Sequence, residues 1–257
     1  MKKTLIPLIV FTLLSSFGYT QQWKLAPLEL YGGIPTFHYF GDIGGSATES
    51  NLLGLKDITL RKLRPGINLG ARYQIIKPLL IRGSYSFGFL AQSDINSRNE
   101  ARNFAFSTII NEAYVSAELY IIPESDENYY YSIMQVRGGL RHFRQPLSLY
   151  VTLGAGGVHY RVTAKDALVG SSRFVGDKSF TMVVPFGIGI KYAIMPKVSL
   201  GAELIARYTM TDYLDGVTSD FSEFNDIYYS LNINVNYKIQ KTRKKNIGLP
   251  RKRFFFF

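Results

Sequence analysis

The amino-acid sequence predicts an all-β fold, a transmembrane antiparallel β-barrel of about eight strands in the outer membrane. Three observations predict it. Apolar and polar residues alternate in segment after segment, as in strands with one apolar face. Many segments run for about 11–14 residues, enough to cross a bilayer at a tilt and about twice the usual strand length of a soluble β-sandwich. Their polar faces carry glycine, serine, asparagine and charged residues, which suit a narrow interior filled by its own side chains.

The N-terminal segment, residues 1–20, is expected to be a signal peptide. Lys2 and Lys3 precede an apolar run, and Gly18 and Thr20 place small side chains before a cleavage site. The run is shorter than the roughly 20 residues of a membrane-spanning helix, which disfavours the alternative of an N-terminal anchor. The sequence has no cysteine, which excludes a lipoprotein anchor, disulfides and a cysteine nucleophile.

The first four expected strands are residues 28–40, 64–75, 79–92 and 111–121. Alternation is weakest in the first, where Gly32, Gly33 and Pro35 interrupt it. The other three alternate regularly, as seen in INLGARYQI, IRGSYSFGF and EAYVSAELYI.

The last four expected strands are residues 147–160, 180–192, 198–210 and 227–239. The alternating strings are LYVTLGA, VPFGIGIKY, LGAELIARY and, most clearly, IYYSLNINVNYKI. Tyrosines at the ends of the apolar faces are expected to form interfacial girdles. They are Tyr73, Tyr192, Tyr208, Tyr229 and Tyr237.

These strands divide the chain into a signal peptide at 1–20, a barrel at 21–239 and a basic periplasmic tail at 240–257. With a periplasmic N-terminus, the outward loops are expected at 41–63, 93–103, 163–178 and 212–225. The inward turns are expected at 76–78, 123–145 and 195–197. Outer-membrane barrels have short inward turns, so the long connection at 123–145 is a candidate docking element or a tolerated insertion.

The net charge of +11 is concentrated outside the predicted barrel. The tail carries Lys241, Arg243, Lys244, Lys245, Arg251, Lys252 and Arg253 without an acidic residue, and the barrel itself is nearly neutral. This distribution argues against a nucleic-acid-binding face. The tail is expected either to dock an acidic partner or to be solvated. The terminal residues 254–257, all phenylalanine, have no assigned role.

The lumen-facing charges are the main candidate site. They are Glu29, Arg72, Arg82, Glu112, Glu118, Lys191, Glu203, Arg207 and Lys238. They could line an ion path. Because the two signs nearly balance and an unpaired buried charge costs several kcal/mol, a closed network of salt bridges is the favoured interpretation.

Several strings resemble the Bacteroidota outer-membrane β-barrel family that includes the type IX secretion system protein PorG. They are HYFGDI, RPGINLGARY, ARNFAFSTIINEAYVSAELYI, VTLGAGGVHY, VPFGIGIKYAI, RYTMTDYLDGVT and NYKIQKTRKKNIGLP, in the expected order over the whole mature chain. The most specific is the loop motif Thr211, Asp212, Tyr213, Leu214, Asp215 and Gly216. The resemblance implies an eight-stranded barrel and, by analogy with PorG, contact with periplasmic rings of the PorK–PorN type.

Other chemistry is disfavoured. The carboxylates of the 212–226 loop could bind Ca²⁺, but their spacing matches no known calcium loop and turn aspartates usually satisfy backbone groups. His38, near Asp42 and Ser46, could belong to a lipid-modifying enzyme, but only sequence distance joins them. The sequence therefore predicts no catalytic, cofactor or metal site.

The leading functional hypothesis is a non-enzymatic anchor for a periplasm-spanning assembly such as type IX protein secretion. Docking is expected through the 123–145 connection and the basic tail. The candidate apolar docking residues are Ile133, Met134, Val136 and Leu140. The alternative is a general structural or surface-interaction barrel that acts through its outward loops. In either case outer-membrane lipid is an expected partner.

Overall fold

The computed structural model describes residues 26–44, 63–95, 97, 99–124, 146–195, 197–217 and 225–239. The expected signal peptide, the basic tail and nearly all of the 123–145 connection lie outside these residues. The strands are β1 (Leu28–Phe40), β2 (Arg64–Ile76), β3 (Leu79–Ser93), β4 (Phe104–Ile122), β5 (Leu147–Asp166), β6 (Phe180–Met195), β7 (Val198–Thr209) and β8 (Ile227–Ile239). A single 3₁₀ turn, η5 (Glu100–Arg102), precedes β4.

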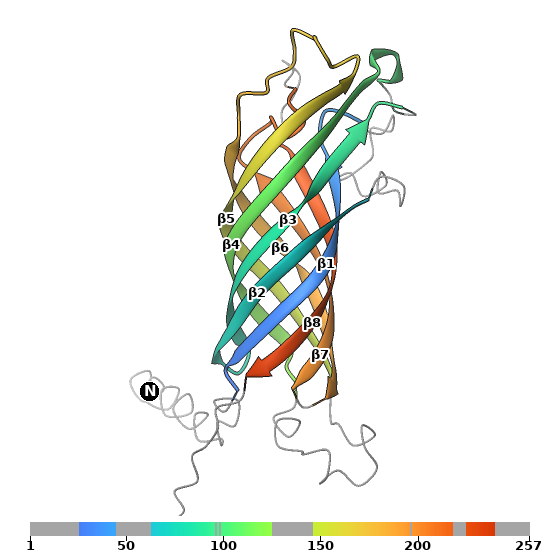
Figure 1. The fold of residues 1–257 in the computed structure, drawn as a ribbon. Helices are drawn as coiled ribbons and strands as arrows, with labels where there is room; N and C mark the ends of the chain where they lie inside the picture. The colour runs from blue at the N-terminus through green and yellow to red at the C-terminus, as the bar shows by residue number, and fades with distance from the viewer. Residues whose placement is uncertain are drawn as a thin grey trace, which may run out of the picture.

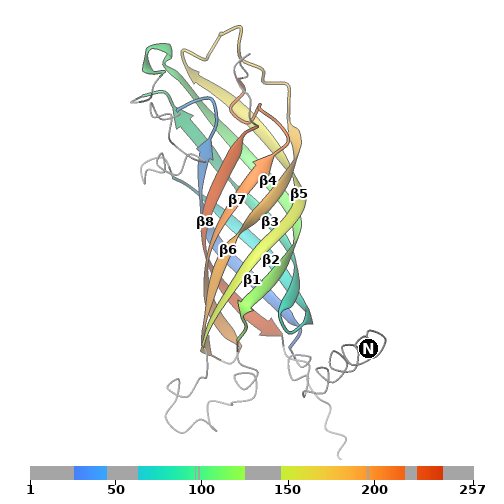
Figure 2. The same ribbon diagram turned by 180° about the vertical axis from the view of Figure 1, so that it is seen from behind.

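The eight strands form one closed antiparallel barrel, which confirms the predicted fold class. Each strand pairs with its neighbour along the chain, and β8 closes the barrel on β1 over the full length of both strands (Figures 1 and 2). Closure gives each strand a paired neighbour on both sides, as a bilayer requires. In the described part of the chain, no helix is long and apolar enough to span a membrane.

The outward face of the barrel is apolar. Ile34, Leu153 and Ile233 are each more than 60% exposed, and large apolar side chains lie exposed on all eight strands. An apolar surface that encircles the whole barrel is suited to contact with lipid rather than water. The protein is therefore an outer-membrane type of β-barrel, with its polar residues turned inward.

The barrel ends differ, which fixes its orientation. The connections β2–β3 and β6–β7 consist of two residues each, at the end where β1 begins and β8 finishes (Figure 1). Short turns and the chain termini belong at the periplasmic end of such barrels. We call this the inner end and the opposite one the outer end.

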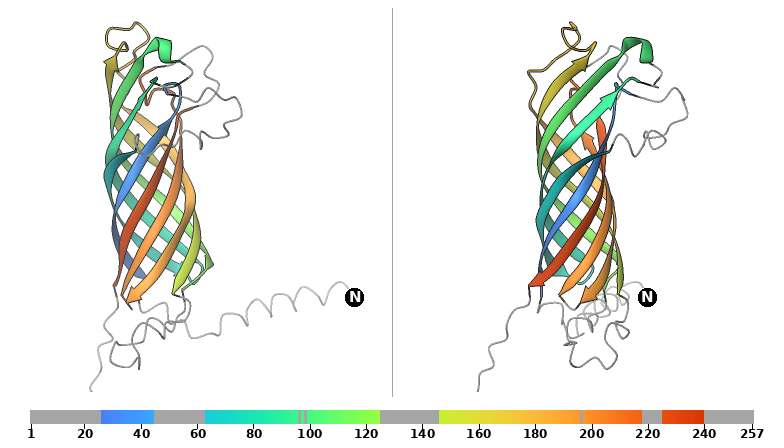
Figure 3. Two further views of the ribbon diagram at one scale, coloured as in Figure 1. Left: turned by 90° about the vertical axis from the view of Figure 1, so that its right-hand side faces the viewer. Right: turned by 45° about the vertical axis from the view of Figure 1, so that its right-hand side comes forward.

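Several strands run past their predicted ends, and two of them do so by six residues or more at the outer end. β4 begins at Phe104 rather than at residue 111, and β5 continues to Asp166 rather than ending at residue 160. The expected loop at 163–178 therefore begins inside β5. At their outer ends these strands invert the alternation, with apolar Phe106 and Val162 facing inward and Arg161 facing outward. Together with the end of β3 they extend beyond the other strands at the outer end (Figure 3).

Candidate functional site

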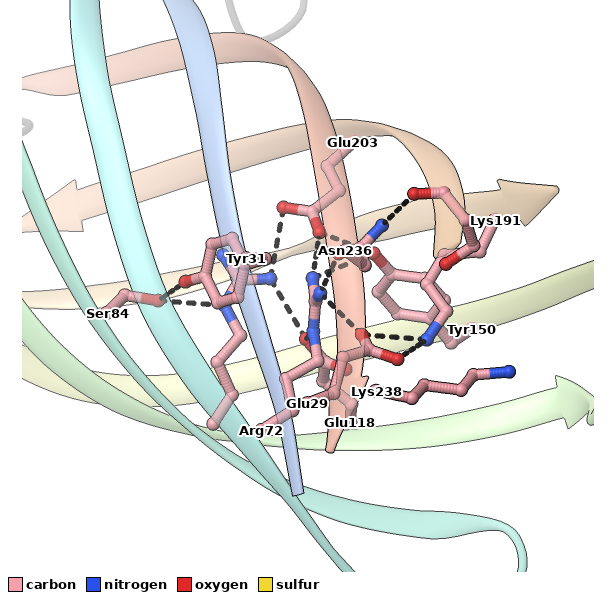
Figure 4. A network of polar contacts seen from close by, with 12 residues as sticks. Glu29, Tyr31, Arg72, Ser84, Glu118, Tyr150, Lys191, Glu203, Asn236 and Lys238 are labelled. Carbon is pink, nitrogen blue, oxygen red and sulfur yellow. Dashed lines mark hydrogen bonds and ion pairs between the residues drawn. The ribbon is translucent and has the colours of Figure 1, made fainter. Parts of the chain in front are cut away.

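The candidate site is the barrel interior, and its centre is a cluster of two arginines and the carboxylates that they share. The guanidinium of Arg72, on β2, donates to Glu29 at 3.0 Å, to Glu118 at 2.9 Å and to Glu203 (Figure 4). It also donates to the side-chain carbonyl of Asn236 on β8. Arg72 is completely buried, so all its donors must be satisfied within the lumen.

The second arginine, Arg82 on β3, shares two of these carboxylates. Its Nη1 lies 2.9 Å from Glu118 and 3.0 Å from Glu203. Its Nε donates to Ser84 at 2.8 Å, and its Nη2 donates to the Tyr114 hydroxyl. Because Glu203 is on β7, on the opposite side of an eight-stranded barrel from β3, these contacts cross the lumen. The shared carboxylates join four strands into one charged cluster.

The inner end of the lumen holds two lysine–glutamate pairs. Lys191 donates to both oxygens of Glu29, at 2.9 and 2.8 Å, and Lys238 pairs with Glu124. Both lysines are buried. A cavity of about 30 Å³ beside these pairs, lined by Gln74 among others, has room for about two water molecules. This end is therefore closely packed.

Midway along the barrel, Arg207 and Glu112 form a separate pair. The Arg207 Nε lies 2.8 Å from each oxygen of Glu112, and Nη1 donates to Ser230 at 2.6 Å. The guanidinium also lies over the rings of Phe37 and Tyr228, 5.5 and 5.2 Å from their centroids. This pair marks the boundary between the polar inner half and the outer half of the lumen.

All nine charges predicted to face the lumen lie inside the barrel wall, and the structure brings them into ion pairs. Glu124 is a tenth member that sequence reasoning missed, because it follows β4 within the expected inward connection. We call the ten residues the interior ion-pair network. It comprises Glu29, Arg72, Arg82, Glu112, Glu118, Glu124, Lys191, Glu203, Arg207 and Lys238. Five cations and five carboxylates balance, so the network can be fully ionised without a net buried charge.

The outer half of the lumen holds a hydrophobic core, which the sequence does not predict. The strands contribute inward aromatic and aliphatic side chains, and the outward connections add four more that are almost completely buried. Those four are Ile43, Leu168, Leu214 and Val217. Tyr39 stacks edge to face on Phe106, with ring centroids 4.8 Å apart. The outer mouth is thus filled by a small hydrophobic core.

Residues 211–217, between β7 and β8, form part of this core, and we call them the plug segment. They contain the motif that the sequence analysis singled out. Leu214 and Val217 are at most 1% exposed, and the Leu214 carbonyl accepts a hydrogen bond from Thr108 of β4 at 2.7 Å. Gly216 adopts a φ of +77°, which favours glycine, and its carbonyl accepts from Val175 N at 2.8 Å. The motif therefore seats a loop in the barrel mouth.

Two buried carboxyls hold the plug segment. Asp226, just before β8, accepts hydrogen bonds from the Tyr39 hydroxyl and from Leu214 N, the latter at 2.8 Å. Asp215 accepts from Val217 N at 2.9 Å. Burial raises the pKa of Asp215 to about 7, and burial and the nearby Asp215 raise the pKa of Asp226 well above its usual range. At least one of the two carboxyls therefore stays protonated under mildly acidic conditions.

The other candidate residues, for a metal site, an enzyme and a docking surface, are not brought together as the interior charges are. Among the described residues, no group of three histidine, aspartate or glutamate side chains is placed to hold a metal ion. His38 is buried on β1, and the Asp42 carbonyl accepts from Arg102 at 2.9 Å, whereas Ser46 lies outside the described residues. The candidate docking residues at 133–140 and in the tail also lie outside them.

Comparison with known proteins identifies the family. No curated protein matches the chain. Among solved structures, it is similar to Ail of Yersinia pestis (14% identity, TM-score 0.42, covering 82% of this chain and 97% of Ail). It is also similar to Neisserial surface protein A (15% identity, TM-score 0.42, covering 83% of this chain and 98% of that protein). A third similar structure is OprG of Pseudomonas aeruginosa (8% identity, TM-score 0.43, covering 84% of this chain and 97% of OprG). Residues 39–240 match the family model described as Domain of unknown function (DUF6089), so the chain belongs to the DUF6089 family.

Proposed function

We propose that the protein is a non-enzymatic outer-membrane anchor for a periplasm-spanning assembly, of the kind that serves type IX protein secretion. The observation that carries the proposal is the obstructed lumen. Ion pairs join strands on opposite sides of the barrel, and a hydrophobic core fills the outer mouth. A barrel filled in this way is suited to act through its two ends and its outer wall rather than as a conduit.

The inner end is the better candidate for the anchoring contact. Both chain termini of the barrel and the long β4–β5 connection leave from this end. The tail carries seven basic residues that an acidic periplasmic surface would attract. The sequence resemblance to the barrel family that includes PorG supports periplasmic ring proteins of the PorK–PorN type as the partner.

The interior ion-pair network has a structural role in this proposal. A rigid barrel keeps the β4–β5 connection and the tail at a fixed spacing, which reduces the entropy lost when a partner binds both. Glu124 and Lys238 pair within the inner mouth, directly where these two segments leave the barrel. This pair therefore ties the candidate docking elements to the wall.

The test is a crosslinking pull-down from outer membranes with an affinity tag in the outward connection 167–179. The expected result is recovery of periplasmic ring proteins with the intact chain and their loss on deletion of 125–145 or 240–257. Replacing the seven basic tail residues by glutamine should weaken recovery in the same direction. Substituting the outward segment 45–62 by a glycine–serine linker of equal length is the control and should leave recovery unchanged. Full recovery with both inner-end deletions would contradict the anchor proposal.

A surface-interaction barrel is the second candidate, because β3, β4 and β5 extend beyond the other strands at the outer end. In that case, replacing the outward connections should abolish the cellular phenotype while tail deletion should not. The same set of variants therefore separates the two proposals.

A further inference from the structure

The outward face of β5 changes character along its length. Its inner part presents Leu149, Val151, Leu153 and Ala155 to the lipid, whereas its outer part presents exposed polar residues. Those residues are His159, Arg161, Thr163 and Lys165. The change occurs level with Asn111 on β4, which pairs with His159 and accepts a hydrogen bond from the Tyr85 hydroxyl at 3.0 Å. A tyrosine, an asparagine and a histidine thus lie where the outward face of β5 turns from apolar to polar, as expected near the headgroups.

Positive charge above this row is one-sided. On β4, the outward residues paired with the outer part of β5 are Ala105, Ser107 and Ile109, all uncharged. On β3, the corresponding residues are Phe89, Ala91 and Ser93. The neighbouring acid, Asp166, ends β5 with a φ of +51°, which breaks the alternation, and its side chain is exposed. Arg161 and Lys165 are therefore the basic residues on the outward faces of β3, β4 and β5 above this row.

The strand geometry makes this pair accessible from the side. Pairing between β5 and β6 stops at His159 and Phe180, so β5 continues beyond the edge of β6. Arg161 and Lys165 lie four residues apart on one face, a separation of about 13 Å, with the Thr163 hydroxyl between them. A guanidinium binds a phosphate through two hydrogen bonds, and an ammonium group adds a second point charge.

We propose that Arg161, Thr163 and Lys165 form a binding surface for the phosphate groups of an outer-leaflet glycolipid. The apolar surface directly below them selects a lipid over an acidic protein. Leu153 is 62% exposed and Phe180 is 65% exposed, so acyl chains can lie against the wall while the phosphates contact the basic pair. A ligand that uses both surfaces must have an anionic head and an apolar tail.

The test is native mass spectrometry of the purified full chain with phosphorylated lipid A and with the same lipid after phosphate removal. The double variant Arg161→Gln/Lys165→Gln should bind the phosphorylated lipid about thirtyfold more weakly, from about fivefold for each basic residue near an anionic membrane surface. The matched control is Lys77→Gln/Lys197→Gln. It removes the same charge from exposed residues at the inner β2–β3 and β6–β7 turns, and it should bind like the unaltered chain. Heat-modifiable migration confirms that each variant is folded.

Three results would overturn the proposal. The first is equal binding of the double variant and the unaltered chain. The second is that the double variant loses as much affinity for the phosphate-free lipid as for the phosphorylated lipid, because the basic pair would then not act through the phosphates. The third is full competition by millimolar inorganic phosphate, which would point to a free anion rather than a membrane lipid as the ligand.

Discussion

Raising the pH is expected to release the plug segment from the outer mouth. Asp215 is buried and its pKa is raised to about 7, so the seated plug binds a proton that the expelled, solvated segment gives up at its ordinary pKa of 3.8. The free energy that this proton contributes to the seated state is therefore fully present below pH 3.8. It is lost as the pH rises to about 7. Asp42 and Asp212 are close enough to oppose ionisation further, and Tyr39 donates to Asp226 beside them.

The size of the effect follows from the shift. A rise from 3.8 to about 7 corresponds to about 4 kcal/mol, at about 1.4 kcal/mol for each pKa unit. The ratio of expelled to seated plug should thus rise about tenfold for each pH unit over this range and then level off. Asp226 has a raised pKa as well, so its ionisation acts in the same direction.

Thiol labelling measures this ratio directly, because the chain has no cysteine of its own. Val217→Cys places a thiol in the plug at a position that is 1% exposed, and Val169→Cys places one on the adjacent connection at a position that is 66% exposed. The ratio of the two labelling rates removes the pH dependence of the thiol chemistry. It should rise about fiftyfold between pH 5 and pH 7, because the seated carboxyl of Asp215 is itself half ionised at pH 7.

The variant Asp215→Asn tests the cause. Its amide keeps the acceptor for Val217 N but cannot ionise, so the labelling ratio should stay low across the same pH range. A ratio that does not change with pH in the native background would refute the reasoning. So would a rise of equal size in the asparagine variant.

Three further predictions concern the interior. Arg207→Met should destabilise the barrel by about 3–5 kcal/mol in urea unfolding from lipid vesicles, because it leaves Glu112 buried without its cation. The double variant Arg207→Met/Glu112→Leu should recover most of this loss of stability, because it removes the unpaired carboxylate as well. An unchanged unfolding midpoint for the single variant would contradict this. Gly216→Ala should loosen the plug, because the residue has a φ of +77° and a Cβ would lie 2.6 Å from the Phe174 ring, with a backbone cost of about 1–2 kcal/mol. The check is faster labelling of Val217→Cys at pH 5, and an unchanged rate would count against the seated geometry. Glu124→Gln should lower barrel stability by about 1–3 kcal/mol through loss of the Lys238 pair, whereas substitution of the exposed Glu100 by glutamine should not.

The two faces of each strand could be predicted from the sequence. A period of two assigns each residue to the outward face or to the lumen without knowledge of the register. Arg72, Arg82 and Glu203 therefore lie in the interior as expected. Which charges meet could not be predicted, since Arg82 reaches Glu203 across the barrel and not along neighbouring strands.

Two features depended on tertiary structure. In the extensions of β4 and β5 the alternation is inverted, and apolar Phe106 and Val162 face a hydrophobic core inside the barrel instead of lipid. The apolar-outward pattern that predicts a membrane strand therefore stops before these strands end. The plug segment has no periodicity, and its insertion depends on a contact with Thr108, which is 106 residues from Leu214 in the sequence. The motif could be recognised, but its place in the barrel could not be derived.

Single-channel recording of the purified chain in a planar bilayer tests the obstructed lumen most directly. The interior ion-pair network lies below the plug, so the account predicts no unitary conductance at pH 5, with the plug seated, or at pH 8, with the plug released. Reproducible conductance steps of the unaltered barrel at either pH would contradict the account, because they would require an open path past Arg72, Arg82 and Arg207.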